Sequence, residues 1–446
     1  MKKVLILAYD FPPYVSVGGL RPYSWYKYLN EFGVYPIVVT RQWNNEFNNH
    51  LDYIAPGDST ESIIETTAYG TIVKAPYTPN FANKLMLKYG NSKYALLRKC
   101  ISAYFELAQF LYLTGPKAPL YFAAERYLKN NQVDVIIATG DPFILFNYAA
   151  KLSKKFNIPW IADYRDPWSQ NLHIQQNYIL KKWFSFFEKK TIRSASLITT
   201  VSDFLEAKIS ELIENKKFLI LPNGYDPEAF ENIELINQQS DSFNIAFVGS
   251  IYNWHPVKSF LSVISLFIKN NTGSSIKVNF YGINNMTELN EMIAIHFNDL
   301  SNHITFHPKT ENKLLIQKLA KDNILLLFNN YSLSGTKIYD YIRLKRAILF
   351  CYANDEEAKK LKKIYFRISE LKKTNDHLQE DIINETNSGY VIQDSKHLLS
   401  TLDHLHKEHS KTGLIQCNTI NTEQYSRKHQ VKQLAKLIHE FSLQKK

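Results

Sequence analysis

The stretch Ser334–Phe350, SGTKIYDYIRLKRAILF, joins a short glycine-containing loop to a helical segment and then to an apolar run. We expect a helix from Lys337 to about Leu344 and a strand at Ala347–Phe350. Strands that alternate with helices recur along the chain, which predicts parallel sheets covered by helices on both faces and an α/β fold class. The expected strands are Lys3–Ala8, Tyr35–Thr40, Val133–Thr139, Pro159–Asp163, Ser196–Thr200, Phe218–Leu221, Asn244–Val248, Lys277–Tyr281, His303–Phe306, Ile324–Phe328 and Ala347–Cys351.

The start of the helix at Lys337 offers chemistry as well as structure. A helix N-terminus has unpaired backbone N–H groups and a partial positive charge, which suit a diphosphate. Lys337 adds a mobile cation, and the Asp340 carboxylate, one turn later, can accept hydrogen bonds from ribose hydroxyls. The segment therefore predicts either a binding site for a sugar nucleotide or an ordinary helix–strand unit in which Gly335 and Thr336 only start the helix.

The 446 residues exceed one typical core, so two or three domains are expected. The alternating pattern breaks at Asn223–Gly224 and in the polar stretch that follows. We expect a Rossmann-like domain at 1–225, a linker or hinge at 226–242, a second Rossmann-like domain at 243–423 and a C-terminal helix at 424–446. The cleft between two such domains is the expected site.

Composition places the chain among soluble globular proteins, with 45% apolar and 21% charged residues. The N-terminus reads as a first strand and not as a signal peptide, and no run approaches the ~18 apolar residues of a membrane span. The cysteines, Cys100, Cys351 and Cys417, are far apart and match no metal-binding spacing. These features indicate a cytoplasmic protein with free thiols.

The formal net charge of +11 suggests an anionic partner. Nucleic acid is excluded as the expected partner because the sequence has no zinc pattern, no RNP-like strand and no basic helix free of apolar periodicity. Residues 81–113 instead suggest an amphipathic helix for an anionic membrane surface, on the inner face of the plasma membrane; the alternative is a helix packed on its own domain. Its basic residues are Lys84, Lys88, Lys93, Arg98 and Lys99, and its periodic apolar residues are Leu97, Ile101, Tyr104, Ala108 and Leu111.

Several motifs, in order along nearly the whole chain, resemble the family 4 glycosyltransferases. They are FPPYVSVGGLRPY (11–23), VDVIIATGDPF (133–143), IPWIADYRDPW (158–168), ASLITTVSDFL (195–205), LPNGYDPEAF (221–230), FVGS (247–250), SGTKIYDYIRLKRAIL (334–349) and YSRKHQVKQLAKLI (425–438). The RDPW motif resembles a bacterial subgroup in particular. The resemblance implies the GT-B fold: an acceptor-side domain and a nucleotide-sugar domain facing a cleft, with a C-terminal helix that crosses back to the first domain.

The sequence departs from the family pattern at four places. The usual Glu–x7–Glu pair becomes Ser332 and Asp340, so the sugar specificity does not carry over. Ser250 replaces the Arg that usually follows the donor-domain glycine, and Lys258 is the candidate for the usual Lys further on. Gly140-Asp141-Pro142 stands where a His is common, and Asp141 is the candidate for part of its role.

The resemblance and the chemistry together suggest a set of site residues. Fixed N–H groups and cations stabilise a departing diphosphate, and no Asp-x-Asp motif suggests a metal. The donor-binding candidates are Gly18, Gly19, Lys258, Gly335, Thr336, Lys337 and Asp340, and the catalytic candidates are Asp141, Asp163, Arg165 and Asp166.

Alternatives remain for two of these assignments. The RDPW charges can instead form an internal Arg–Asp pair with Trp168 as a core lid. Arg21 can be a second phosphate contact or a surface residue at a helix start.

The sequence therefore suggests a retaining, metal-independent glycosyltransferase that needs no cofactor. It would move a sugar from a nucleotide-sugar donor to a glycan or lipid-linked glycan acceptor in surface polysaccharide biosynthesis. Two alternatives stay open. One is a nucleotide-sugar epimerase of the same fold, and the other is a catalytically silent GT-B subunit that supports a partner enzyme.

Overall fold

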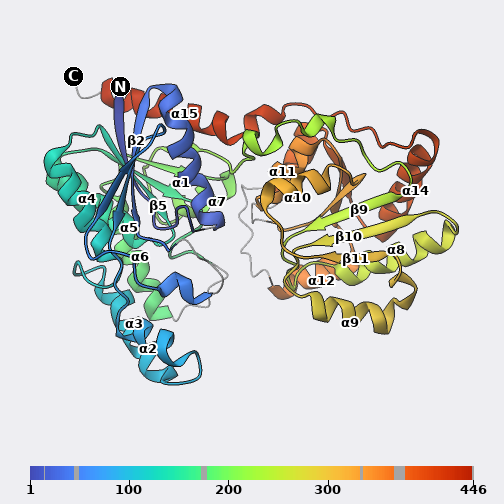
Figure 1. Ribbon diagram of the computed structural model, residues 1–446, viewed down its shortest axis with the longest axis horizontal. Coiled ribbons are helices and arrows are strands. Elements are labelled where there is room, and N and C mark those ends of the chain that lie inside the picture. The colour runs from blue at the N-terminus through green and yellow to red at the C-terminus, as the bar shows by residue number, and fades with distance from the viewer. Residues whose placement is uncertain (15, 45–49, 172–177, 332–334, 366–376, 444–446) are drawn as a thin grey trace. The chain divides into compact units, whose positions relative to one another are not determined.

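The computed structural model describes residues 1–14, 16–44, 50–171, 178–331, 335–365 and 377–443 (Figure 1). The chain forms two compact units, which are Met1–Pro222 together with Lys428–Lys446, and Asn223–Arg427. Each unit is built on a mainly parallel sheet with helices on both faces, so the predicted α/β fold class is confirmed.

The first unit contains an eight-stranded sheet in the order β3-β4-β2-β1-β5-β6-β7-β8. Only the β3–β4 pair is antiparallel. The central strands are buried along most of their length, which explains their nearly continuous Val, Ile and Leu content. The strands are β1 (Lys2–Leu7), β2 (Val34–Arg41), β3 (Ile63–Thr66), β4 (Thr71–Ala75), β5 (Val135–Gly140), β6 (Trp160–Tyr164), β7 (Leu197–Thr200) and β8 (Phe218–Ile220).

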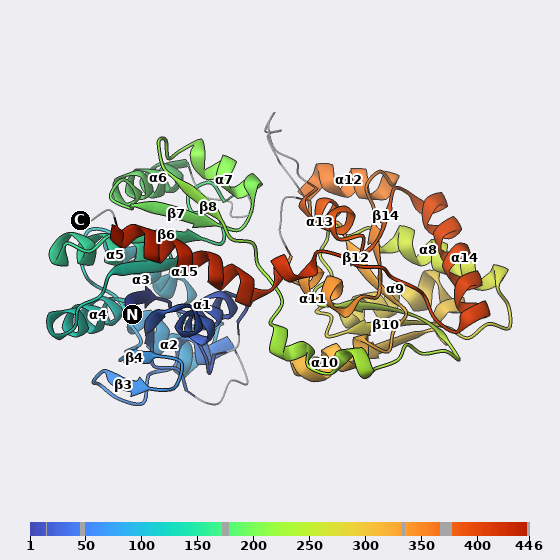
Figure 2. The ribbon, with the colours of Figure 1, turned by 90° about the horizontal axis from the view of Figure 1, so that it is seen from above.

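Helices cover both faces of this sheet, and one of them comes from the far end of the chain. α15 (Arg427–Leu443) buries Val431, Leu434 and Ile438 in the same core as Val4 of β1 (Figure 2). The predicted return of the C-terminal helix to the first domain is thus present. The other helices of the unit are α1 (Val17–Tyr28), α2 (Phe81–Tyr89), α3 (Ala95–Ala108), α4 (Ala118–Asn130), α5 (Ile144–Phe156), α6 (Tyr178–Ile192) and α7 (Asp203–Ser210).

The single helix predicted over 81–113 is wrong, because the segment forms a two-helix hairpin. α2 ends at Gly90, whose φ of 72° lies in the left-handed region. Tyr94, with φ of 57°, then starts α3. Glycine adopts this conformation without steric cost, so the Gly90–Tyr94 turn was the signal that ends the first helix.

The second unit contains a six-stranded parallel sheet in the order β11-β10-β9-β12-β13-β14. The strand order reverses between β9 and β12, and ligands of open α/β sheets bind at the carboxyl ends of strands at such a point. The strands are β9 (Phe243–Val248), β10 (Ile276–Tyr281), β11 (Ile304–His307), β12 (Ile324–Phe328), β13 (Ala347–Cys351) and β14 (Gly389–Ile392). The helices are α8 (Val257–Asn270), α9 (Met286–His296), α10 (Asn312–Leu319), α11 (Lys337–Leu344), α12 (Glu356–Tyr365), α13 (Leu378–Thr386) and α14 (Ser395–Thr412).

Residues 226–242, predicted as a linker, belong to the second unit. The short helical turns Pro227–Phe230 and Ile233–Leu235 bury Phe230 and Ile233 in the core of that unit. The polar composition of the stretch concealed these two apolar anchors. Within the described residues, no helix is long and apolar enough to cross a membrane.

Asp322, just before β12, is a buried carboxyl group of the second unit. It is 2% exposed and accepts hydrogen bonds from Asn279 Nδ2 at 2.9 Å and from the Tyr281 hydroxyl at 3.3 Å. Burial raises its pKa from 3.8 to about 7, although both hydrogen bonds oppose the shift. The native state therefore holds a proton there that the unfolded chain releases above about pH 4.

We predict that the free energy of unfolding contains a term from Asp322 that falls as the pH rises from about 4 to about 7. The sign follows because the native state binds more protons than the unfolded state in this range. Asp322→Asn should remove the term, so the unfolding free energies of variant and wild type should diverge in favour of the variant by about 1.4 kcal/mol per pH unit. Urea titrations followed by circular dichroism measure this; the exposed Glu291→Gln on α9 is the control. Parallel pH profiles for Asp322→Asn and wild type would contradict the assignment.

Candidate functional site

Asp163, at the end of β6, is the centre of a buried polar network in the first unit. Its side chain is fully buried and pairs with Arg21, whose Nη2 lies 2.8 Å from Oδ1. The hydroxyl groups of Thr139 and Thr199 also donate to its carboxylate, at 2.9 and 2.7 Å. Arg21 Nη1 donates in addition to the carbonyl of Leu221 at 2.6 Å. We interpret Asp163 as a structural brace, because these donors occupy both of its oxygens.

The alternatives given for Arg21 both differ from what the structure shows. Arg21 is 7% exposed, so it is neither a surface residue nor open to a phosphate. The internal Arg–Asp pair considered for the RDPW motif does exist, but its arginine comes from α1 and not from the motif. No local pattern in the sequence predicts this pairing, because 142 positions separate its members.

We predict that Asp163→Asn destabilises the first unit by about 3 kcal/mol or more, because it leaves the buried Arg21 charge without a counter-charge. Urea unfolding followed by tryptophan fluorescence measures this, since five of the six tryptophans lie in the first unit. Asp166→Asn, at an exposed position three residues further on, should change stability by less than about 0.5 kcal/mol. An Asp163→Asn protein as stable as wild type would contradict the bracing role.

Arg165, two residues after Asp163, lies at the N-terminus of α1. Its Nε donates to the carbonyl of Gly140 at 2.7 Å, and its Nη2 donates to the carbonyl of Asp141 at 3.2 Å. A Cβ atom on Gly18 would lie 2.6 Å from Arg165 Nη1 and 2.8 Å from Asp10 Oδ2. Gly18 is thus required for the close approach of these two side chains, and the Arg165 guanidinium is held beside the first turn of α1.

Asp10, after β1, is a residue of this cluster that the sequence analysis missed. Its Oδ2 accepts a hydrogen bond from Ser16 Oγ at 2.8 Å, and Ser16 in turn caps α1 by accepting from the Gly19 amide at 3.0 Å. Asp10 Oδ1 is buried and has no hydrogen-bond partner among the residues that the structure describes. Burial raises the pKa of Asp10, while Ser16 and Arg165 oppose the shift.

The remaining predicted residues of the first unit differ in exposure. Asp141 and Asp166 are exposed, whereas Trp168 is 5% exposed and stacks on Phe143 with ring centroids 5.3 Å apart. Trp168 also contacts Phe110 at 5.4 Å. The aromatic contacts hold the RDPW loop on the core, and they leave Asp166 on the surface.

The second unit gathers hydrogen-bond donors around Gly335, before α11. A Cβ atom on Gly335 would lie 3.4 Å from Asn330 Nδ2 and 3.5 Å from Gln379 Nε2. Gln379 is 1% exposed. Its Oε1 accepts a hydrogen bond from the backbone N–H of Asn330 at 3.1 Å, so its Nε2 faces away from that N–H group. Gln379 Nε2 is buried without a partner in the described structure. A buried N–H group without an acceptor is costly, so this atom points to a ligand.

The orientation of Asn330 is fixed by two aromatic neighbours. Its Oδ1 accepts from Trp254 Nε1 at 3.1 Å and contacts His255 Nε2 at 2.9 Å. His255 Nδ1 accepts from the Tyr252 amide at 3.3 Å, so the ring is neutral with its proton on Nε2. Burial lowers the pKa of His255 to about 4, which keeps this arrangement at neutral pH. Asn330 Nδ2 is therefore presented toward Gly335. The sequence analysis had given His255 no role.

Lys337 and Asp340 occupy the first turn of α11, as predicted. Their charged groups lie 3.8 Å apart, with side chains 35% and 14% exposed. Burial raises the pKa of Asp340, and the nearby Lys337 and Arg427 oppose the shift. Thr336 precedes the helix but its side chain does not cap it, and in the first turn the Tyr339 amide donates to the Thr336 carbonyl at 3.3 Å.

Three predicted features lie outside this group or outside the described residues. Lys258 is exposed in the first turn of α8 and forms no ion pair with any residue that the structure describes. Gly19 packs against the backbone of Asp10, and Ser332 lies outside the described residues. In the described part of the chain, no group of three or more His, Cys, Asp and Glu side chains is placed to hold a metal.

Comparison with known proteins places these features in context. Residues 23–229 match the model of Glycosyltransferase Family 4. No curated protein matches the chain at a significant level. Among solved structures, the sucrose-phosphate synthase of Thermosynechococcus elongatus is 11% identical with a TM-score of 0.58, and the match covers 100% of this chain and 97% of that one.

Two further structures are similar over their whole length. The α,α-trehalose-phosphate synthase (UDP-forming) of Burkholderia vietnamiensis is 9% identical with a TM-score of 0.56, covering 99% of this chain and 100% of that one. A trehalose-6-phosphate protein from E. coli, bound with UDP-2-fluoro glucose, is 11% identical with a TM-score of 0.55, covering 99% and 97%. At these identities the structural matches establish the fold alone, and the family model matches residues 23–229, which is less than half of the chain. The segment 23–229 is therefore similar to the family 4 glycosyltransferases, and the chain as a whole has the GT-B fold.

Proposed function

We propose that this protein is a retaining, metal-independent glycosyltransferase that binds its nucleotide-sugar donor around Gly335. The observation that carries the proposal is the convergence of N–H donors there. Asn330 Nδ2 and Gln379 Nε2, which is buried and has no partner among the described residues, both approach the position of a Gly335 side chain. The E. coli structure with UDP-2-fluoro glucose supports a nucleotide-sugar donor for a protein of this fold.

The charges near Gly335 suit a diphosphate. Lys337 and the N-terminal end of the α11 dipole are positive, and the Asp340 carboxylate is the acid of the same helical turn. As the bond between the sugar and the diphosphate breaks, negative charge accumulates on the diphosphate. Fixed N–H groups and a lysine stabilise that charge without reorganisation, so no metal ion is required for this task. Asp340 is then available to the ribose hydroxyls.

The first unit would supply the acceptor side of the reaction. Arg165 is held by two backbone carbonyls, which fixes its guanidinium beside α1 as a contact for a phosphate or for the sugar. Asp141 and Asp166 are the exposed carboxylates of the same region, so they replace Asp163 as candidates for orienting an acceptor hydroxyl. We propose a glycan or lipid-linked glycan as acceptor, in surface polysaccharide biosynthesis.

We predict that Lys337→Ala weakens nucleotide-sugar binding by about 1.5–3 kcal/mol, the range for hydrogen bonds to charged groups. Gln379→Glu should weaken it at least as much, because it keeps the oxygen that accepts from the Asn330 amide and places a carboxylate near the diphosphate. A thermal-shift screen against UDP-, GDP-, ADP-, CMP- and dTDP-sugars identifies the donor, and titration calorimetry then measures each variant.

The control is Lys321→Ala, an exposed lysine that follows α10 in the same unit. It removes one positive charge at a distance in sequence from α11, and it should leave donor affinity unchanged. Unchanged affinity in both Lys337→Ala and Gln379→Glu would remove this region from the donor site.

A further inference from the structure

The α2–α3 hairpin presents an apolar surface to solvent. Leu96, Leu97 and Tyr104 are 76%, 46% and 62% exposed, and Leu111, just after α3, is 52% exposed. Leu96, Leu97 and Tyr104 belong to α3, and together with the exposed Cys100 they recur at helical spacing along one side of that helix. The surface is therefore a continuous stripe and not a scatter of single side chains, which need no explanation.

One edge of the same apolar face meets its own unit, so the predicted apolar face is only partly buried. Ile101 and Phe105 are half-buried, and Ala108 is buried. Leu97, Tyr104 and Leu111, predicted to lie with them, remain exposed. A helix that needs only to pack on its own domain has no reason to carry an apolar face so much wider than the part that it buries.

Positive charge surrounds this exposed stripe. Residues 81–113 contain five basic residues and one acid, Glu106, and the lysines at 84, 88, 93 and 99 are all exposed. α6 repeats the combination, because Tyr178 and Phe186 are 68% and 58% exposed beside the exposed Lys181 and Lys182. The two elements are neighbours, since the buried Phe110, after α3, contacts Phe184 and Phe187 of α6.

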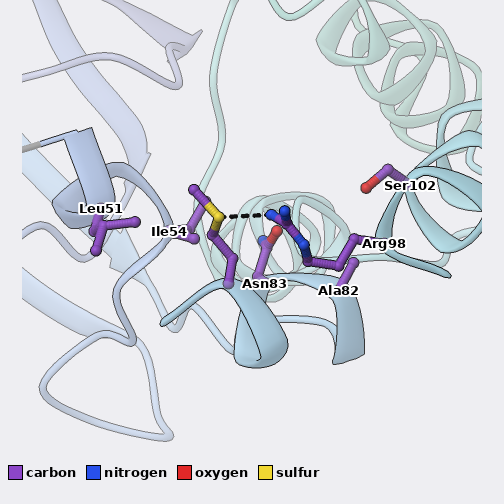
Figure 3. Close-up of a pocket in the computed structure, with 7 residues that line it drawn as sticks. Leu51, Ile54, Ala82, Asn83, Arg98 and Ser102 are labelled. Carbon is purple, nitrogen blue, oxygen red and sulfur yellow. Dashed lines mark hydrogen bonds between the residues drawn. The ribbon is translucent and has the colours of Figure 1, made fainter. Parts of the chain in front are cut away.

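Arg98 has a different role from the lysines. It lies in a pocket of about 260 Å³ under the hairpin, where it donates to the Met86 sulfur and to the Asn91 carbonyl (Figure 3). These contacts hold α3 to α2 and to the turn between them. Leu51, Ile54, Ala82, Asn83 and Ser102 complete the lining. The cations left for an external partner are therefore the lysines.

We propose that the α2–α3 hairpin, with α6, is a docking surface for an anionic lipid membrane. Apolar and aromatic side chains bordered by lysines, with almost no acid, match the boundary between lipid headgroups and acyl chains. The lysines contact the headgroup phosphates, and the leucines and tyrosines enter the boundary layer. The surface lies on the membrane without crossing it. This inference does not depend on the donor site or on the acceptor.

The test uses the full-length protein and vesicle flotation at low salt. Wild type should bind vesicles that contain phosphatidylglycerol and ignore vesicles of phosphatidylcholine alone. The triple substitution Lys88→Gln, Lys93→Gln and Lys99→Gln should weaken binding by about 100-fold, from the typical gain per lysine at an anionic surface. Leu96→Ser with Leu97→Ser and Tyr104→Ser should weaken it by at least about tenfold.

Matched controls come from exposed positions of the second unit. They are Lys396→Gln with Lys407→Gln and Lys411→Gln on α14, and Ile295→Ser with Leu314→Ser on α9 and α10. Both should bind vesicles as wild type does. Thermal unfolding of every variant shows that it folds, and its stabilisation by nucleotide sugar reports the donor site separately.

Three results would overturn the proposal. The first is a wild-type protein that binds neither kind of vesicle, and the second is vesicle binding by the stripe and lysine variants that equals that of wild type. The third is self-association in sedimentation velocity that the stripe substitutions abolish, without vesicle binding, which would assign the surface to a second copy of the chain.

Discussion

The arrangement of the candidate site residues in the first unit depends on the buried ion pair between Arg21 and Asp163. It joins α1 to the end of β6, and through Thr139 and Thr199 it reaches the ends of β5 and β7. Arg21 also holds the carbonyl of Leu221, after β8. Parallel strands bring these ends to one edge of the sheet, and the shared carboxylate fixes them there. Arg165 and Gly18 take their positions from this arrangement, because each lies close in sequence to one member of the pair.

The second unit orders its candidate site by a neutral network. Trp254 and His255 donate to Asn330 Oδ1, and the backbone N–H of Asn330 donates to Gln379 Oε1. Because the oxygens of both side-chain amides are engaged in this way, their nitrogens, Asn330 Nδ2 and Gln379 Nε2, point toward Gly335. The network therefore converts two ambiguous amide groups into fixed N–H donors before any ligand arrives. Preorganised donors of this kind stabilise a developing negative charge better than solvent does, because they need no rotation at the moment of reaction.

The sequence predicted what depends on local pattern. The alternating strands and helices, the return of the C-terminal helix and the helix at Lys337 all follow from short apolar runs and from the family motifs. It did not reveal the partners of Asp163 and Gly335, because Arg21 is 142 positions away and Gln379 is 44 positions away. Periodicity predicted the apolar face of α3 but not that only part of it is buried, and it missed the turn at Gly90. The stretch 226–242 looked like a linker because most of its residues are polar, although Phe230 and Ile233 are buried in the core and Ala229 and Ile236 pack against it.

The central claim is that donor recognition takes place around Gly335. Hydrogen–deuterium exchange of the full-length protein, with and without the nucleotide sugar that stabilises it, tests this most directly. The account predicts slower exchange in the peptides that contain Gly335–Asp340 and Leu378–Gln379, because their N–H groups or neighbours acquire ligand contacts. Protection confined to other segments, with exchange at these peptides unchanged at saturating ligand, would contradict it.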